Sequence, residues 1–269
     1  MIDVLGYSIR RACRIVGMAR STFQRAKVKD TPQDPDQELR ATLRAYSTAH
    51  PCHGFRRAHA YLVHDVGMEI NLKKVQRLWR EEGLTRKTPR RQVRRGKTTM
   101  PVVKANEPNH VWSIDFQYDV TRDGRPIKIA SMVDEFTRES LLDIVERSID
   151  ADQLAKALTT VFAARGVPRV LRMDNGPEFI SKRLQRLCGK RIGMAYIPPG
   201  TPWNNGYVES FNNHRRRECL RRHDFANLIE ARHTITEFHR DYNLHHRHSS
   251  LGYLTPVEYA EQWKTTHTL

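Results

Sequence analysis

Residues 170–180, VLRMDNGPEFI, contain a change of pattern that decides how the second half of the chain folds. The apolar run that starts at Val170 is typical of a short buried strand, and it stops at Asp174. Asn-Gly would suit a hairpin turn, but Pro177 suits the first position of a helix. Helical spacing follows in Ile180, Leu184, Leu187 and Cys188. A strand followed by a helix places Asp174 at a carboxyl strand end, where α/β sheets bind ligands.

The segments around this stretch predict a mixed α/β architecture. Residues 109–120, NHVWSIDFQYDV, alternate as a strand does, with Trp112, Ile114, Phe116 and Tyr118 on one face and Ser113, Asp115 and Gln117 on the other. Further strands are expected at 126–136, 139–145, 168–174 and 194–198, and helices at 150–166, 177–191 and from about 204. Three meandering strands followed by alternating helices and strands indicate a layered sheet and not a run of βαβ units.

Two further carboxylates stand out beside Asp174. Asp115 lies in mid-strand opposite large apolar residues, and a buried lone carboxylate is costly, so it is exposed, paired or bound to a cation. Glu209 falls on a polar helix face. A single Glu on such a face is ordinarily a solvent-exposed residue without a functional role. The same face carries Asn205, Asn212, Asn213 and Arg216. Amides and Arg beside a carboxylate suit a nucleic-acid backbone that runs over a metal site.

The charge of the chain is segregated. The formal net charge is +16 over 269 residues, and residues 1–104 hold 23 Lys and Arg against 9 Asp and Glu. Such a local excess predicts a polyanionic partner. Nucleic acid is expected, because no basic amphipathic helix with a broad apolar face supports an anionic membrane surface. No apolar run is long enough for a membrane span. No secretory signal and no CxxC pair occur, so reduced thiols and a cytoplasmic location are expected.

The basic half divides into three predicted parts. Residues 1–30 contain two short helices around Gly17, which fit a helix-turn-helix or an ordinary helical hairpin equally. Residues 36–85 predict a helical DNA-associated region in which Asp36 caps the first helix and Lys73, Lys74 and Arg77 face phosphates. Residues 86–104 form a basic linker, and its phosphate-contacting residues are expected to be Arg90, Arg91, Arg94 and Arg95.

No zinc site is expected from residue spacing. Cys52 lies between His50 and His53, but no second ligand pair follows at a workable distance along the chain. His110, His214 and residues 245–248 also lack zinc spacing.

Three segments resemble a known signature. SIDF, MDNGPEF and NNGYVESFNN resemble the DDE signature of the transposase and retroviral integrase superfamily. Over nearly the whole chain the sequence is similar to the catalytic, second-frame (OrfB-type) transposases of insertion sequence family three. HGFRRAHAYL and QRLWREEGL resemble the helical DNA-associated region of that group, and FHRDYNLHHRHSSLGYLTPVEY resembles its closing motif.

Two departures from that pattern occur. Between Asp174 and Glu209 lie 34 residues, where the group usually has 35. The tail has His246 and Arg247 where the group usually has Arg-Pro. The zinc-binding HHCC module of retroviral integrases is not present.

The resemblance implies a ribonuclease H-like core, a mixed five-stranded sheet flanked by helices, at residues 105–220. A basic all-α N-terminal region precedes this core, and a C-terminal helical segment at 221–269 follows. Asp115, Asp174 and Glu209 are then the catalytic residues and the ligands of two Mg²⁺ ions, for which Mn²⁺ can substitute. Asp115 would bridge the ions, and the other two carboxylates would each hold one. Asp134 is expected to have a structural or supporting role.

The resemblance also implies a function. We expect strand cleavage at the ends of an insertion sequence followed by strand transfer, on double-stranded DNA and in the bacterial nucleoid. A homodimer or larger assembly on DNA and a DNA-binding partner encoded by an upstream frame, joined by frameshift fusion, are also expected. Two alternatives are a metal-dependent nuclease of the same fold and a non-catalytic DNA-binding protein derived from a transposase.

Overall fold

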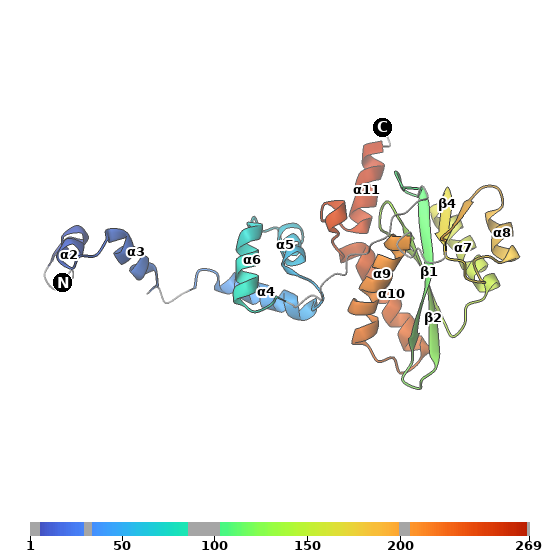
Figure 1. Ribbon diagram of the computed structural model, residues 1–269, viewed down its shortest axis with the longest axis horizontal. Helices are drawn as coiled ribbons and strands as arrows, with labels where there is room; N and C mark the ends of the chain where they lie inside the picture. Colours follow the sequence, from blue (N-terminus) through green and yellow to red (C-terminus); the bar gives the residue numbers. More distant parts are fainter. Residues whose placement is uncertain (1–5, 30–33, 86–102, 199–204, 268–269) are drawn as a thin grey trace.

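The computed structural model describes residues 6–29, 34–85, 103–198 and 205–267, with the side chains of 25–29 left aside (Figure 1). At the N-terminal end, α2 (Ile9–Ile15) and α3 (Arg20–Lys29) lie on either side of Gly17, so the two expected short helices are present. Ser8 caps α2 by accepting a hydrogen bond from the backbone N–H of Arg11. Among the described residues, no helix is long and apolar enough to cross a membrane.

The next part is a three-helix bundle of α4 (Gln37–Ala49), α5 (Phe55–His64) and α6 (Leu72–Glu81). Fully buried Leu43, Leu62 and Leu78 contribute one residue from each helix to its core. The prediction that Asp36 caps α4 is wrong in detail. Asp36 occupies the cap position but makes no cap hydrogen bond, because its carboxylate forms ion pairs with Lys74 and Arg77 of α6. These pairs tie the start of α4 to α6.

The second half of the chain contains the expected mixed five-stranded sheet. Its strands are β1 (Val111–Val120), β2 (Pro126–Asp134), β3 (Ser140–Glu146), β4 (Val170–Met173) and β5 (Gly193–Tyr196), in the spatial order β3-β2-β1-β4-β5. The first three strands form an antiparallel meander, whereas β4 and β5 add to β1 in parallel. This strand order is the ribonuclease H-like arrangement that the resemblance implied.

Helices cover both faces of the sheet (Figure 1). Trp112 and Ile114 of β1 pack with α7 (Ala151–Arg165) and α8 (Lys182–Cys188). The other face carries α9 (Gly206–Glu218) and α10 (Leu228–His245), and there Ile129 packs with residues of α10. The predicted alternation of β1 is therefore confirmed. The chain ends with α11 (Pro256–His267), after short 3-10 helices at Leu220–Arg222 and Ser249–Leu251.

The segment after Asp174 differs from the prediction. Residues 177–180 form a turn, and α8 begins only at Lys182, capped by the side chain of Ser181. Pro177 is therefore not the first helical residue. The turn buries Phe179, which stacks on Phe116 of β1 with ring centroids 4.7 Å apart. Burial of this ring beneath β1 explains why the chain turns before it becomes helical.

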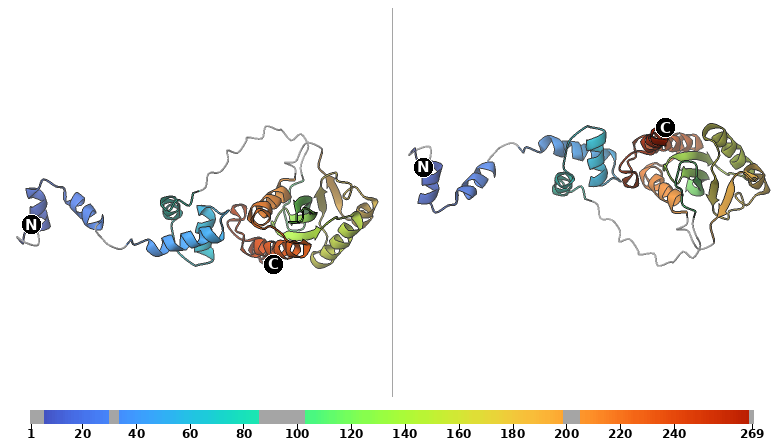
Figure 2. Two further views of the ribbon diagram at one scale, coloured as in Figure 1. Left: turned by 90° about the horizontal axis from the view of Figure 1, so that it is seen from below. Right: turned by 90° about the horizontal axis from the view of Figure 1, so that it is seen from above.

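The bundle lies next to the C-terminal elements and not next to the sheet, as both views of Figure 2 show. Arg247, which follows α10, forms a bidentate ion pair with Asp65 of the bundle. The Nη2–Oδ1 distance is 2.5 Å and the Nε–Oδ2 distance is 2.8 Å. Arg247 is also bonded to Glu258 at the start of α11. A single buried guanidinium thus joins the bundle to the C-terminal segment.

Candidate active site

The pairing of two parallel strands brings the first two carboxylates level. Ser113 of β1 lies opposite Arg172 of β4, and both side chains bond to Glu135, so they share one face of the sheet. Two residues further along each strand are Asp115 and Asp174. Because side chains alternate with a period of two, both carboxylates point to that same face. The register therefore sets Asp115 beside Asp174 just where β4 ends.

Asp174 is exposed, and its own turn holds its carboxylate. Oδ1 accepts a hydrogen bond of 2.8 Å from the backbone N–H of Gly176. A Cβ at position 176 would lie 3.0 Å from that oxygen, so a side chain there would push the carboxylate aside. Asn175 donates to the Ile197 carbonyl at 2.7 Å, which fixes the turn to the end of β5. These bonds hold the Asp-Asn-Gly turn, and with it the Asp174 carboxylate, in one position.

Asp115 is half-buried, and its surroundings disfavour the ionised carboxylate. Burial raises the pKa of Asp115 to about 6, and the negative charges of Asp174 and Glu209 add to the rise. A hydrogen bond of 2.9 Å from Asn212 Nδ2 to Oδ2 opposes it. Asp174 and Glu209 therefore lie close enough to Asp115 to disfavour its negative charge, and a bound cation would offset this repulsion.

Glu209 lies in the first turn of α9 and faces Asp115 across a cavity of about 230 Å³. The cavity is also lined by Phe116, Gln117, Asn212, Asn213 and Arg216. In the described ranges the three carboxylates do not form a group whose ligand oxygens all lie within 4.8 Å of one another. Their spacing is thus wider than one ion would require.

The fully buried Arg215 supports this site by holding a residue that contacts Asp115. Arg215 donates from Nη2 to Asn212 Oδ1 at 2.8 Å and from Nε to Gln117 Oε1 at 2.9 Å. Its guanidinium also pairs with Asp143 of β3 and bonds to Ser131 of β2. Arg215 therefore orients the amide that holds Asp115, and it is a positioning residue.

Sequence reasoning missed Arg215, which is the first of three consecutive arginines at 215–217. Its signal was its place three residues after Asn212 and four after Phe211, on the side of α9 that faces the sheet. Asp143, its partner, also binds Nδ1 of His239 from α10 at 2.8 Å. The network consequently joins three strands and two helices.

The Integrase core domain family models match residues 105–201 and 190–256, and an HTH-like domain matches residues 33–92. A 31.7 kDa protein of insertion element IS407 from Burkholderia multivorans is 38% identical over 98% of this chain and 94% of its own length. The chain belongs to the DDE transposases of insertion sequence family three. It is accordingly a polynucleotidyl transferase that acts on DNA.

Other relatives of the transposase agree. A protein of insertion element IS476 from Xanthomonas euvesicatoria is 36% identical over 98% of this chain and 76% of its own length. The transposase of IS904 from Lactococcus lactis is 26% identical over 74% of this chain and 84% of its own length. Among solved structures, the catalytic core of HTLV-2 integrase in complex with magnesium matches with a TM-score of 0.46 and 18% identity. That match covers 58% of this chain and 98% of the other.

The structure changes the interpretation of two predicted DNA-binding amides of the transposase. Asn205 is 4% exposed and donates to the Ile114 carbonyl at 3.4 Å, so it is a structural residue. Asn212 lines the cavity, but both of its amide atoms are engaged by Asp115 and Arg215. Arg216 is exposed at the cavity rim, as its predicted role requires.

The predicted basic contacts in the bundle divide similarly. Lys73 is exposed, whereas Lys74 and Arg77 pair with Asp36, and Arg77 also pairs with Glu81. Exposed pairs of this kind are weak and can exchange for a phosphate. The four linker residues Arg90, Arg91, Arg94 and Arg95 lie outside the described residues.

Asp134 has the structural role that was expected. It is 1% exposed, and it accepts hydrogen bonds from the backbone N–H groups of Asn109, Phe136 and Thr137. It also accepts one from the indole of Trp112. These bonds fix the turn after β2.

The raised pKa of Asp115 predicts a stability effect with a defined sign. Without divalent metal, the folded transposase keeps the Asp115 proton up to about pH 6, whereas the unfolded chain releases it near pH 3.8. Between these values the native state binds more protons, so this group lowers the free energy of unfolding as pH rises. Asp115→Asn should remove that contribution, and urea unfolding at several pH values in a chelator measures it.

The comparison that matters is the difference between the wild-type and Asp115→Asn profiles, because groups remote from Asp115 titrate equally in both. Asp152→Asn, an exposed aspartate on α7, is the matched control and should leave the profile unchanged. Superimposable profiles for wild type and Asp115→Asn would contradict the assignment.

Proposed function

We propose that the transposase cleaves DNA strands at insertion-sequence ends and transfers them to target DNA, using Asp115, Asp174 and Glu209 as catalytic, metal-holding residues. The observation that carries this proposal is the placement of the three carboxylates: Asp115 and Glu209 line one cavity, and the β1–β4 register sets Asp174 beside Asp115. Carboxylates gathered in this way repel one another, and bound cations would offset that cost. A nucleic-acid enzyme with such a site is suited to phosphoryl transfer.

The donor set fits magnesium. All three side chains offer carboxylate oxygens, the ligands that hard cations such as Mg²⁺ prefer, and Mn²⁺ can substitute. Asp115, Asp174 and Glu209 would together hold the two ions of such a site. Two such ions, when bound, would activate the attacking oxygen and offset charge on the leaving oxygen of an in-line displacement.

The surrounding residues of the chain have separate tasks. Asn212 holds one oxygen of Asp115 through its amide, and Arg215 keeps that amide in place. Arg216, at the rim of the cavity, is suited to hold a phosphate of the scissile strand. A water molecule attacks first, and the freed 3′-hydroxyl attacks a target strand next, so no covalent enzyme intermediate is needed.

We also propose a division of labour along the chain. Residues 1–30 and 36–85, the latter with Lys73, Lys74 and Arg77, bind element-end DNA, and 86–104 contacts phosphates through its arginines. Residues 105–220 perform the chemistry, and 221–269 form the closing helical segment. Assembly on DNA as a homodimer or larger, and fusion to a DNA-binding partner from an upstream frame, belong to this proposal. Reaction at two element ends requires at least two active sites.

An end-cleavage and strand-transfer assay tests the proposal. Labelled element-end DNA, a supercoiled target and Mg²⁺ are incubated with the full chain, and nicked and joined products are separated on gels. Nicking at the element end followed by joining is the expected result. Cleavage without joining would favour a metal-dependent nuclease of the same fold. Binding without any Mg²⁺-dependent product would overturn the proposal in favour of a non-catalytic DNA-binding protein.

A further inference from the structure

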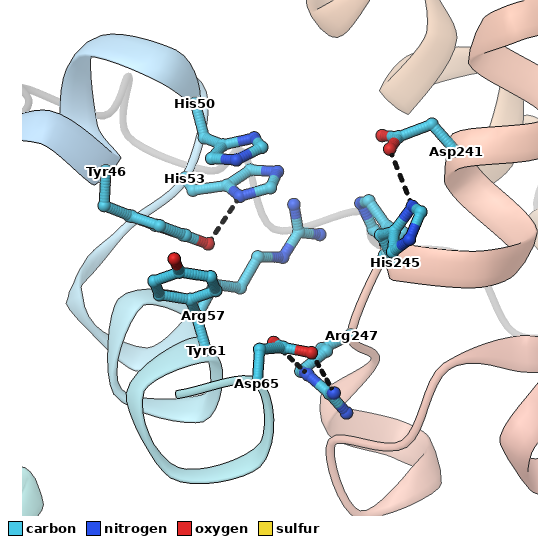
Figure 3. Close-up of a pocket in the computed structure, with 10 residues that line it drawn as sticks. Tyr46, His50, His53, Arg57, Tyr61, Asp65, Asp241, His245 and Arg247 are labelled. Atoms are coloured by element: carbon cyan, nitrogen blue, oxygen red, sulfur yellow. Dashed lines mark hydrogen bonds and ion pairs between the residues drawn. The ribbon is translucent and has the colours of Figure 1, made fainter. Parts of the chain in front are cut away.

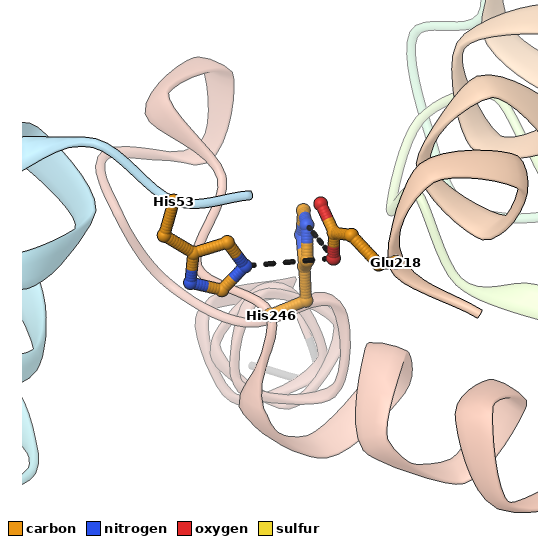
Figure 4. Close-up of side chains that lie close together, drawn as sticks. All are labelled: His53, Glu218 and His246. Carbon is orange, nitrogen blue, oxygen red and sulfur yellow. Dashed lines mark hydrogen bonds and ion pairs between the residues drawn. The ribbon is translucent and has the colours of Figure 1, made fainter. Parts of the chain in front are cut away.

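A second group of metal-ligating side chains lies between the three-helix bundle and the half of the chain that contains the sheet. His53 comes from the turn before α5, Glu218 from the last turn of α9, and His246 from the residue after α10 (Figure 4). One ligand atom from each of the three lies within 4.8 Å of the others. Three segments far apart in sequence therefore present nitrogen and oxygen atoms to one small space.

The distances in this group fit a shared ion better than direct hydrogen bonds. His53 Nε2 lies 3.4 Å and His246 Nε2 lies 3.6 Å from the same oxygen, Glu218 Oε2. Good N–H···O bonds span about 2.7–3.2 Å. Two ligands held at about 2.0–2.1 Å on a tetrahedral Zn²⁺ are separated by roughly 3.4 Å. The observed separations are close to that tetrahedral edge.

His246 supplies an independent sign that something is to be bound. Its side chain is 3% exposed, and its buried Nε2 has no hydrogen-bond partner. That atom points toward Glu218 (Figure 4). Buried polar atoms almost always have partners. A metal ion between these side chains would satisfy Nε2.

The outer atoms of all three residues are held in the way that metal ligands usually are. Nδ1 of His53 bonds to the Tyr46 hydroxyl at 2.8 Å, and Nδ1 of His246 bonds to His248 Nε2 at 3.0 Å. The free oxygen of Glu218, Oε1, bonds to His214 Nδ1 at 3.1 Å and to Arg57 Nη1 at 3.3 Å. Metal-binding histidines commonly donate their second ring N–H in this manner, which leaves the other nitrogen to bind the ion.

We propose that His53 Nε2, Glu218 Oε2 and His246 Nε2 bind a zinc ion that clasps the three-helix bundle to the catalytic half. Two nitrogens and one carboxylate oxygen suit a borderline cation such as Zn²⁺ better than Mg²⁺. An adjoining cavity of about 300 Å³, lined by both histidines and by Arg57, gives room for a fourth ligand from solvent (Figure 3). The ion would add to the Arg247–Asp65 ion pair, which joins the same two parts.

Zinc binding by the untagged full chain tests this proposal. The protein is stripped with a chelator and dialysed, and ZnCl₂ is added in competition with a chromogenic chelator. Bound metal is counted by mass spectrometry. One tightly held Zn²⁺ per chain is expected, and His53→Asn and His246→Asn should each weaken it at least about 100-fold, because ligand loss exceeds the 10–100-fold cost of losing an outer partner. Absence of bound zinc in the wild type would overturn the proposal.

Two further variants separate this site from its surroundings. In the Asp115→Asn/Asp174→Asn double variant the tight zinc must remain, since its loss would assign the ion to the carboxylate site. His245→Asn is the matched control, because His245 lines the same cavity but is exposed and pairs with Asp241. Unchanged zinc affinity in both His53→Asn and His246→Asn would refute the site. Urea unfolding of the stripped variants checks that they remain folded, and His53→Asn, at a loop position, keeps the test valid if the buried His246→Asn does not fold.

Discussion

Asp174→Asn is expected to reduce both end cleavage and strand transfer at least about 1000-fold. The change removes a carboxylate that, in the proposed mechanism, holds a metal ion at the reacting phosphate. The exchange of one oxygen for an amide nitrogen preserves shape but takes away the negative charge. Asp174 is exposed, so the free energy of unfolding should change by less than about 0.5 kcal/mol. The assay is single-turnover cleavage and joining of element-end DNA at saturating Mg²⁺, with binding measured separately by gel shift.

Asp152→Asn is a suitable control for Asp174→Asn, since it also removes one exposed carboxylate from the same half of the chain. Its cleavage and joining rates should equal those of the wild type. A normal cleavage rate in Asp174→Asn would exclude this residue from the catalytic group. Weaker gel-shift binding that accounts for the whole loss would instead make Asp174 a DNA-binding residue.

Arg215→Met is expected to lower the free energy of unfolding by about 3–5 kcal/mol, the range for removing one partner of a buried ion pair. Arg215 is fully buried, and its loss leaves Asp143, whose side chain is 5% exposed, without its guanidinium partner. Urea unfolding measures the change. Arg216→Met is the matched control on the adjacent, exposed position and should stay within about 0.5 kcal/mol of the wild type.

A double variant makes the Arg215 prediction sharper. In Asp143→Asn/Arg215→Met neither charge remains, so this protein should be more stable than Arg215→Met alone. If the double variant is the less stable of the two, the cost arises from lost packing and hydrogen bonds and not from an unpaired carboxylate. In variants that stay folded, a higher Mg²⁺ concentration should be needed for half-maximal cleavage. Arg215 positions Asn212, and Asn212 holds Asp115.

The alternating pattern predicted β1 well because the two faces of this strand lie in different surroundings. The alternation in 111–120 follows from apolar packing against α7 and α8 on one face and polar bonding to α9 on the other. Gly166 and the capping pair Asp150 and Gln153 bound α7 where the sequence placed it. The caps of α7 depend on neighbours along the chain, and the two different faces of β1 leave a period-two pattern in its own residues, so a single sequence contains both signals.

The errors arose where tertiary contacts decide. Pro177 suits a helix start, but burial of Phe179 against Phe116 takes the chain through a turn first. Asn205 and Asn212 lie on a polar helix face, yet that face packs against β1. Arg215 could not be told from its two neighbours without knowing which side of α9 meets Asp143. Likewise, His53 and His246 lie on different elements nearly two hundred residues apart, so no ligand spacing revealed their meeting.

The helix α9 carries Glu209, which lines the cavity, at one end and the bundle-facing Glu218 at the other. Glu209 and Glu218 are nine positions apart, which corresponds to roughly 13.5 Å along a helix axis. The helix therefore connects the bundle-facing side of the molecule to the cavity beside Asp115 as one rigid element. A tilt of about 5° about the Glu218 end would displace Glu209 by about 1 Å, and a misplacement of that size can cost on the order of 100-fold in rate. A rigid α9 would thus transmit a tilt at its bundle-facing end to Glu209 without any contact at the cavity.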